Sequence, residues 1–449
     1  GQGLTLWTGL SYSKTYDPIS IKKYPQGIKP YTSTNEYGFL RGLGTTLRYK
    51  KLEFSLVASR KLLDANIGGT DTINNDIYYV TSLQETGYHR TYNELSDKNA
   101  IAENIFGGNI SFNEKQYQIG ITAYKSNYSS PIIKKTEPYN QFDFTGKDNT
   151  NLGANFNLLL LPFNFFGEIS LSENLKKAYL IGLQGNIENR MTIGILFRKY
   201  DVGFQNIRNA AFGENTKNSN EQGIYIGTEY FLAKKWTISA YCDLFEFPWL
   251  RYNDDSPSVG SDYLIKIDYR YNRKLNFYFQ FREKNKFQNN SETIYTKQHE
   301  ETIRRNFRIN INLIATDELS FNSRFEWCVF TKGNYYNNNG FLIYQDMSYK
   351  FRFYPVKFSA RYALFDTDSY DERIYAYEND VLYAFSIPSY YYKGSKVYFL
   401  IKCDVNKNID LWFRFSQTYY LNKNKISSGL DEINGNTKSE IKTQLIIKF

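Results

Sequence analysis

The chain has 449 residues, of which 41 are Tyr, 34 Phe and 5 Trp, whereas Pro (10) and Met (2) are scarce. Mean hydropathy is −0.55, and no stretch approaches the roughly 18 consecutive apolar residues of a membrane-spanning helix, which excludes a helical membrane protein. Several small domains or one large closed sheet remain, and the abundance of Tyr and Phe favours the sheet. Low hydropathy is compatible with a transmembrane β-barrel, because each spanning strand turns one side-chain row to lipid and the other to water.

The charged and reactive residues exclude several classes of function. The net charge of +9 comes from 55 basic and 46 acidic residues that are dispersed along the chain, which indicates solvated faces or a weakly anion-favouring lumen. Three widely spaced cysteines and two histidines provide little material for a disulfide scaffold, a zinc site or a catalytic triad. We therefore expect no cofactor and no enzymatic activity.

The first residues predict a processed or partial gene product. Gly1-Gln2-Gly3-Leu4 has no initiator Met and no basic, apolar leader. We therefore expect the chain to begin inside a longer protein.

Connections of alternating length divide the chain into strands. Short turns are predicted near 49–52, 113–116, 161–163, 188–190, 233–235, 272–274, 316–318, 351–355, 378–380 and 404–408. Longer loops are predicted near 15–38, 61–105, 126–151, 173–176, 201–221, 246–259, 285–302, 331–338, 366–373, 387–394 and 420–439. Together they predict one domain over 1–449, an all-β transmembrane antiparallel β-barrel of about 22 strands. The range is 20–24, because two of the loops are short. An even count with both termini on the short-turn side is typical of bacterial outer-membrane barrels.

The first long loop, 15–38, has two open interpretations. It can fold into the lumen as a constriction, where Lys29 and Glu36, with Arg41 just beyond, would set the local field and the selectivity. It can also be a structured outer loop held by proline turns.

The longest insertion, 61–105, must cover or enter the mouth of a wide barrel. His89, Arg90 and Glu94 lie together in it, ahead of a short predicted helix over 94–106. This trio resembles part of a catalytic cluster, but no Ser or Asp nucleophile lies at a diagnostic spacing. We therefore expect a hydrogen-bonded plug or constriction rather than an active site.

Aromatic residues at strand ends predict a girdle at the membrane surface. Phe247, Trp249 and Tyr252 lie where a strand passes into a loop, and Phe449 closes the chain. We favour this structural role over ligand stacking. The final segment, 441–449, alternates and ends on that phenylalanine, which resembles the signal that outer-membrane assembly machinery reads.

The C-terminal half alternates with period two over about ten residues per segment. In 261–271 and 275–282, for example, apolar and aromatic side chains occupy one row and charged residues the other. The second row predicts a charged, somewhat basic lumen. Its members are Lys266, Asp268, Arg270, Arg282, Arg308, Arg324, Lys357, Arg361 and Arg414.

An acidic run follows Phe365. Asp366, Asp368 and Asp371 could together bind Ca²⁺, since hard cations prefer clustered oxygen ligands. Their spacing is not that of an EF-hand, so we favour an ion-pair network with Arg373.

Several motifs resemble the barrel portion of helix-hairpin-helix-containing outer-membrane proteins of Bacteroidetes-type bacteria. They are Gly1-Gln2-Gly3-Leu4, Gln26-Gly27-Ile28-Lys29-Pro30-Tyr31, Gly87-Tyr88-His89-Arg90, Phe247-Pro248-Trp249-Leu250-Arg251, Tyr344-Gln345-Asp346, Phe365-Asp366-Thr367-Asp368-Ser369-Tyr370 and Tyr375-Ala376-Tyr377-Glu378-Asn379-Asp380. The resemblance covers essentially the whole chain and implies a location in the outer membrane. Family members carry a periplasmic helix-hairpin-helix region ahead of the barrel, and any DNA uptake would depend on that region, which we do not find here. The resemblance implies no catalytic residue.

Two functions follow as expectations. The first is an outer-membrane channel or transport protein that passes an anionic or polymeric substrate. The alternative is a plugged structural barrel that anchors a surface or periplasmic protein complex. Outer-membrane lipid and lipopolysaccharide are expected to surround it, and a surface lipoprotein or a periplasmic protein is the expected partner class.

Overall fold

The computed structural model describes residues 2–6, 14, 17–34, 37–70, 77–290, 299–333 and 336–448. Among these residues the main sheet contains 21 strands, and two small sheets have two strands each. The described helical segments are α1 (Tyr92–Ser96) and the 3-10 turn η1 (Gly429–Asp431). Neither is long and apolar enough to span a bilayer. The predicted fold class, the all-β antiparallel sheet of a β-barrel protein with 20–24 strands, is confirmed.

The chain forms two compact units, which are described separately below. Unit 1 consists of Gly1–Tyr230, Tyr241–Ser261 and Phe287–His299, and unit 2 of Phe231–Ala240, Asp262–Lys286 and Glu300–Phe449. The strands wholly within unit 1 are β1 (Gly42–Tyr49), β2 (Leu52–Leu63), β3 (Ala65–Thr70), β4 (Ile77–Leu83), β5 (Ile101–Asn113), β6 (Tyr117–Ile132), β7 (Gly146–Leu160), β8 (Phe163–Ser172), β9 (Lys177–Ile187) and β10 (Met191–Tyr200).

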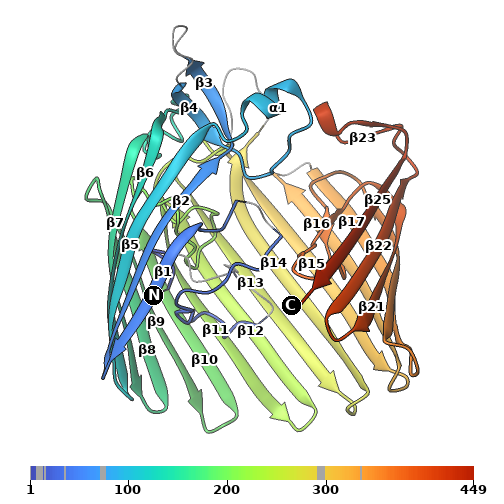
Figure 1. The fold of residues 1–449 in the computed structure, drawn as a ribbon. Coiled ribbons are helices and arrows are strands. Elements are labelled where there is room, and N and C mark those ends of the chain that lie inside the picture. The colour runs from blue at the N-terminus through green and yellow to red at the C-terminus, as the bar shows by residue number, and fades with distance from the viewer. Residues whose placement is uncertain are drawn as a thin grey trace. The chain divides into compact units, whose positions relative to one another are not determined.

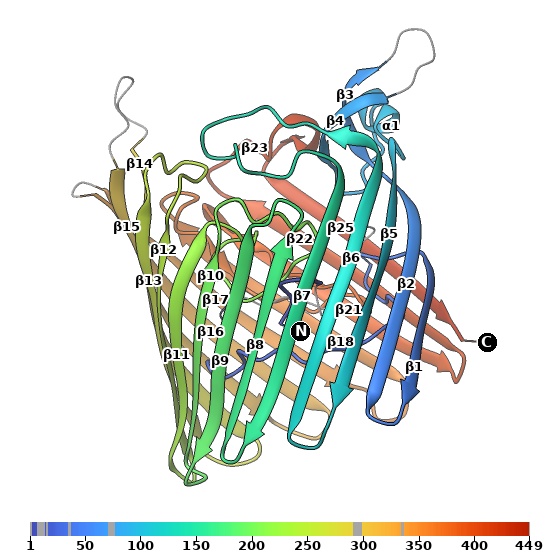
Figure 2. The ribbon, with the colours of Figure 1, turned by 90° about the vertical axis from the view of Figure 1, so that its left-hand side faces the viewer.

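Five strands contribute residues to both units: β11 (Glu221–Ala233), β12 (Trp236–Phe247), β13 (Ser258–Arg270), β14 (Leu275–Asn289) and β15 (His299–Ile314). The strands wholly within unit 2 are β16 (Leu319–Lys332), β17 (Tyr336–Lys350), β18 (Val356–Thr367), β19 (Ile374–Tyr375), β20 (Ser389–Tyr390), β21 (Lys393–Asn406), β22 (Ile409–Tyr420), β23 (Lys425–Ile426), β24 (Ile433–Asn434) and β25 (Thr437–Ile447). Figures 1 and 2 show the long strands joined by tight turns at one end and by longer connections at the other.

Nine of the ten predicted short turns join consecutive long strands, and the tenth does not. The predicted turn at 378–380 is wrong, because it lies inside one long connection from β18 to β21. The two strands expected on either side of it are replaced by the two-residue pair β19 and β20, in which Ile374 is opposite Tyr390. The loops predicted at 366–373 and 387–394 are therefore the two ends of this single connection. A strand expected before residue 15 lies largely outside the described residues.

The long strands expose their apolar side chains and bury their charged ones. In β10, Phe197 is 42% exposed, whereas the next residue, Arg198, is fully buried. In β17, Phe341 and Ile343 are exposed, whereas Asp346 on the other row is buried. A soluble sheet does the opposite, so this arrangement indicates an apolar environment on one face and a polar interior on the other.

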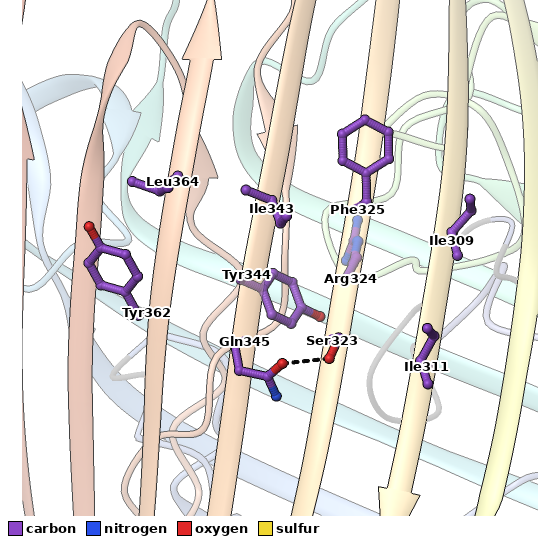
Figure 3. Close-up of a pocket in the computed structure, with 10 residues that line it drawn as sticks. All are labelled: Ile309, Ile311, Ser323, Arg324, Phe325, Ile343, Tyr344, Gln345, Tyr362 and Leu364. Atoms are coloured by element: carbon purple, nitrogen blue, oxygen red, sulfur yellow. Dashed lines mark hydrogen bonds between the residues drawn. The ribbon is translucent and has the colours of Figure 1, made fainter.

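The exposed face of β15 to β18 has a shallow hollow, shown in Figure 3. Its lining residues are Ile309, Ile311, Ser323, Arg324, Phe325, Ile343, Tyr344, Gln345, Tyr362 and Leu364. On this apolar surface the Ser323 hydroxyl donates to Gln345 Oε1 at 2.5 Å. The hydroxyl and the amide oxygen therefore satisfy each other, so this hydrogen bond needs no water on the apolar surface.

Candidate channel interior

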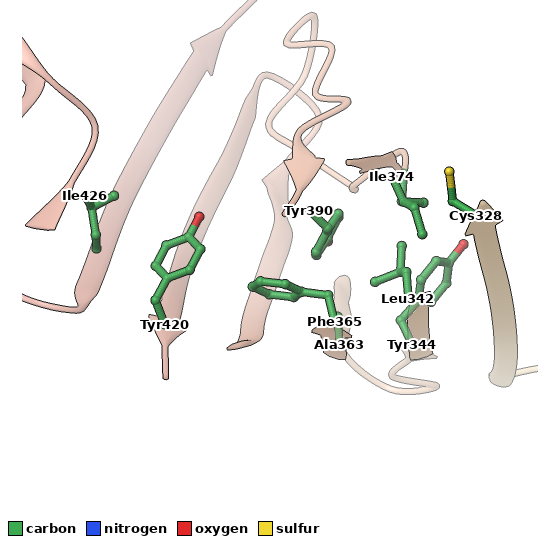
Figure 4. Packing of buried hydrophobic residues seen from close by; sticks show 10 residues of the cluster. Cys328, Leu342, Tyr344, Ala363, Phe365, Ile374, Tyr390, Tyr420 and Ile426 are labelled. Atoms are coloured by element: carbon green, nitrogen blue, oxygen red, sulfur yellow. The ribbon is translucent and has the colours of Figure 1, made fainter. Parts of the chain in front are cut away.

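In unit 2, the connection 368–392 folds back along the polar face of the sheet. Ile374 and Tyr390 pack against Leu342 and Phe365 from the strands, as Figure 4 shows. Further along, Leu382 O accepts a bond of 3.0 Å from the Gln444 amide of β25. The connection therefore reaches from the long-loop end of the strands toward their short-turn end.

Glu378 fixes the middle of this connection. It is fully buried and pairs with Arg414 of β22 at 2.5 Å and with Lys396 of β21 at 2.7 Å. The Tyr390 hydroxyl donates to it at 2.5 Å. Next to it, Asp380 forms an ion pair with Lys442 of β25 at 2.8 Å. A buried carboxylate of this kind requires such partners, because its desolvation would otherwise be very costly.

Further ion pairs cover the same polar face of unit 2. Arg361 donates to both oxygens of Asp346 at 2.5 and 2.7 Å. Glu326 pairs with Arg308 at 2.8 Å and with Arg324, whose guanidinium also donates to Tyr375 O at 3.1 Å. Five of these residues come from strands and the sixth, Tyr375, from the connection, so the Arg324 guanidinium links the wall to the connection.

In unit 1, the first described residues lie on the polar face of the sheet. The Glu168 carboxylate of β8 accepts the backbone N–H groups of Gln2, Leu4 (3.1 Å) and Thr5 (3.0 Å). The Asn206 amide donates to the carbonyls of Leu4 and Thr5 at 2.7 and 2.8 Å. This bent segment is thus held by a carboxylate, which accepts from its N–H groups, and by an amide, which donates to its carbonyls.

The following residues of this segment contact β9 and β11. The Tyr225 hydroxyl donates to Pro18 O at 2.8 Å, and the Gln184 amide to Ile19 O at 3.0 Å. Lys23 donates from its backbone N–H to Gln2 Oε1 at 2.9 Å. We call residues 2–6 and 17–23 the inner segment. Several of its backbone polar groups are satisfied by side chains of the wall and by residues of the connection 201–220 rather than by a strand partner.

The connection 201–220 also folds inward in unit 1. Its Arg208 pairs with the buried Glu103 of β5, and its Asn206 accepts a bond from the Tyr124 hydroxyl. At its end, Glu221 of β11 accepts the backbone N–H groups of Glu214 and Asn215 at 2.8 and 2.9 Å. This connection therefore bridges strands from β5 to β11 within the unit.

Arg198 of β10 is the central cation of unit 1. It donates to Glu221 at 2.6 Å and to both oxygens of Asp243 at 2.8 and 3.1 Å, and all three side chains are fully buried. Lys14 adds ion pairs to Asp243 at 2.5 Å and to Glu214 at 2.6 Å. This cluster therefore joins the strand residues Arg198 and Asp243, Glu214 of the connection 201–220, and Lys14 near the N-terminus.

The contact of the inner segment is expected to depend on pH through Lys23. Burial lowers the pKa of Lys23 from 10.5 to about 8, against a smaller opposing effect of Glu168. Between pH 8 and 10.5 the Lys23 amine binds fewer protons when the inner segment contacts the wall than when the segment is released. The equilibrium constant for this contact therefore rises with pH in this window, by up to about tenfold per pH unit. Below pH 8 we expect no change from this group.

The spectrum of a spin label at residue 24 measures this equilibrium, with Tyr24→Cys placed in a chain whose three native cysteines are replaced. The mobile component should shrink between pH 8 and 10.5. In Lys23→Met the dependence should disappear. A Lys23→Met chain with the same pH response as the parent would contradict the assignment.

The constriction residues predicted in the first loop do not cluster. Lys29 is exposed and donates to Gln26 at 3.1 Å. Arg41 is exposed and its guanidinium lies 5.4 Å from the centroid of the Phe39 ring. Glu36 lies outside the described residues. Residues 17–23 of this loop lie on the polar face, and Tyr37 contacts the buried Lys61 and Arg208 there; the prediction singled out neither.

The second predicted group is held at the long-loop end of unit 1. His89 contacts Asp64 at 2.8 Å, whereas Arg90 pairs with Glu94 at 2.7 Å. Helix α1 begins after Thr91, whose hydroxyl accepts the Glu94 N–H. The Arg90 hydrogen bonds lower the pKa of Glu94 to about 2. These contacts order the insertion, and its role in closing the lumen stays a prediction.

The residues of the predicted lumen row fall into two groups: those that form ion pairs and are at least partly buried, and those that are exposed. Arg308, Arg324, Arg361 and Arg414 belong to the ion-pair network described above. Lys266 pairs with Asp268 at 2.8 Å, and Arg282 pairs with the buried Asp262 at 2.6 Å. Arg270 and Lys357 are exposed near the short turns. The row lies on the expected side of the sheet, but most of its cations are neutralised by carboxylates.

Phe247 does not lie on the exposed row that the predicted aromatic girdle at 247–252 requires, whereas a place of Trp249 and Tyr252 at the membrane surface stays a prediction. Phe247 is 1% exposed, because Asp243, Phe245 and Phe247 share the inward row while Leu244 points outward. Trp249 donates from its indole to Pro138 O at 3.0 Å. Tyr252 is exposed but packs on Tyr139 in a connection, and Phe449 lies outside the described residues.

The calcium hypothesis finds no support in the described residues, where no group of three or more His, Cys, Asp or Glu side chains could hold a metal. Asp366 pairs with Lys393 at 2.9 Å, and Asp368 accepts the Asn339 N–H at 2.7 Å. Arg373 donates to Tyr375 Oη and Tyr370 O rather than to the acidic run. The carboxylates are therefore used separately.

Sequence reasoning missed the buried acids of the interior: Glu103, Glu168, Glu221, Asp243, Glu326, Asp346, Glu378 and Asp380. Most of them lie on the same alternating row as the predicted cations, so counting acids and bases together would have found them. Glu378 lies in a segment without a ten-residue alternation and shortly before Pro388, which was the available signal that 374–387 is not a pair of spanning strands.

No protein-family model matches the chain, and no curated protein matches it. It is similar to the ferripyoverdine receptor of the outer membrane of Pseudomonas aeruginosa (10% identity, TM-score 0.43, covering 83% of this chain and 60% of that one). It is also similar to the FrpB iron transporter from Neisseria meningitidis (9%, 0.45, 90% and 70%) and to an anion-selective porin from Comamonas acidovorans (10%, 0.36, 78% and 100%). The chain spans less than two thirds of the ferripyoverdine receptor. These likenesses assign no ligand, and the helix-hairpin-helix resemblance stays a prediction.

Proposed function

We propose that the protein is a bacterial outer-membrane β-barrel that passes a polar solute through its lumen past segments folded against the inner wall. The observation that carries this proposal is the inverted sheet, whose exposed row is apolar and whose buried row is charged. Inner connections held by ion pairs, 201–220 in unit 1 and 368–392 in unit 2, narrow such a lumen rather than build a catalytic centre.

The membrane face predicts a large effect of a charge on the exposed row. Ile343 of β17 is 46% exposed between Phe325 and Leu364. Ile343→Arg should lower the free energy of unfolding by about 2–4 kcal/mol in lipid vesicles, because the guanidinium would enter hydrocarbon. Tyr354→Arg, at an exposed position beside a short turn, should cost at most about 1 kcal/mol. Urea unfolding monitored by Trp fluorescence measures both. A neutral Ile343→Arg would argue for a water-facing sheet.

Conductance in planar bilayers tests the channel itself. Replacing 374–387 by a short Gly-Ser linker should raise the single-channel conductance, because it removes the segment along the inner wall of unit 2. The matched control shortens 427–432, the exposed tip between β23 and β24, and leaves Ile426 and Ile433 in place. Its conductance should remain that of the parent. If both shortened proteins are as silent as the parent, the channel proposal fails and the plugged anchor is favoured.

A further inference from the structure

We propose that the connection 368–392 carries a stacking site for an uncharged sugar chain, formed by Tyr375, Tyr377 and Phe385. We call these three residues the aromatic row. The inference rests on the proposed function, because it names the class of solute that the inner wall of unit 2 would receive.

The aromatic row is exposed on the polar side of the sheet, away from the lipid face. Tyr375 is 47%, Tyr377 49% and Phe385 55% exposed. The rings of Tyr377 and Phe385 lie 5.8 Å apart. Exposed aromatic rings present apolar surface to water. A ligand with an apolar ring face that covers this surface binds favourably because the surface is removed from water.

The backbone beneath the row is held rigidly. Alternate residues Ile374, Ala376 and Glu378 are buried against the wall, which turns Tyr375 and Tyr377 outward. Arg324 donates to Tyr375 O at 3.1 Å. The rings are therefore preorganised, and ligand binding would cost little conformational entropy of the protein.

Two neighbouring features select the ligand class. The backbone N–H groups of Ala376 and Glu378 already donate to Pro388 O and Ser386 O, so this edge is paired within the connection, and Tyr375 O on the other edge already accepts from Arg324. The exposed carboxylates of Asp368 and Asp371 precede the row and repel a polyanion such as single-stranded nucleic acid.

The polar groups beside the rings suit hydroxyl-rich rings. The Arg373 guanidinium lies 4.3 Å from the Tyr370 ring centroid and donates to Tyr375 Oη at 2.9 Å. Tyrosine hydroxyls and carboxylates offer both donors and acceptors at the edges of the aromatic surface. A neutral sugar has apolar C–H faces for the rings and hydroxyls for these edges, so it satisfies both.

Calorimetric titration of the purified chain, in a detergent without a sugar headgroup, tests this site with maltohexaose and cellohexaose. At least one hexasaccharide should bind, and Tyr375→Ala/Tyr377→Ala should weaken binding about tenfold or more. Tyr375→Phe/Tyr377→Phe should keep affinity within about threefold. The control Tyr354→Ala removes an exposed ring at a short turn and should have no effect.

The proposal is overturned if neither hexasaccharide binds, if the double alanine variant binds like the parent, or if the oligonucleotide dT6 binds more tightly than the sugars. Binding in detergent requires no conduction. A silent bilayer with intact, tyrosine-dependent sugar binding would therefore reject the channel but keep the site, and the reverse result would reject the site alone.

Discussion

Glu378→Ala is expected to lower the free energy of unfolding by about 3–5 kcal/mol, because it leaves buried cations without their carboxylate. Arg414 is 1% exposed and Lys396 is largely buried, and both pair with Glu378. The Tyr390 hydroxyl would lose its acceptor as well. Urea unfolding in lipid vesicles measures the loss, and hydrogen exchange should show faster opening of the Glu378 N–H bond to Ser386 O.

The matched control is Glu432→Gln, which removes an exposed ion pair with Lys425 in the same unit. Exposed pairs contribute little, so the expected loss is below about 1 kcal/mol. A Glu378→Ala loss as small as that of the control would mean that hydrophobic packing of Ile374 and Tyr390 holds the connection and that the ion pairs are dispensable.

The two faces of the sheet could be predicted because strand periodicity depends only on local sequence. Counting alternate residues places Arg308, Arg324, Arg361 and Arg414 on the inner row, and the alternation of short and long connections predicts nine of the short turns. The same parity, counted from Asp243, places Phe247 inward and excludes it from a girdle on the exposed row.

The inner connections could not be predicted in this way. Whether a connection folds back along the wall depends on partners that are far away in the sequence. Glu378 meets Arg414 only because β22 passes beneath the connection, and Glu103 meets Arg208 across more than 100 residues. In the shorter connection 421–436, Glu432 pairs locally with Lys425, although Ile426 packs in the same cluster as Tyr390. Sequence alone does not predict which of these acids pairs locally and which pairs at long range, because each pairing depends on the side chain that the fold places opposite.

Arg198→Met is expected to cost about 3–5 kcal/mol of unfolding free energy, because it leaves two fully buried carboxylates without their shared cation. Methionine fills much of the volume, so the loss reports mainly on charge. The backbone N–H groups of Glu214 and Asn215, which bond to Glu221, should exchange faster with solvent. Arg48→Met is the control, since that guanidinium is 72% exposed in its pair with Glu53 and its loss should cost at most about 1 kcal/mol.

A double-mutant cycle separates charge from packing at this cluster. If Arg198 acts through its ion pairs, Arg198→Met/Asp243→Asn should be less destabilised than the sum of the two single variants, because the second change removes one of the charges that lost Arg198 as a partner. Lys14 also pairs with Asp243, so Asp243→Asn alone should loosen the N-terminal residues. Strictly additive losses would contradict this coupling, and the inner connection 201–220 would then be held by its contacts to Glu103 and Tyr124 instead.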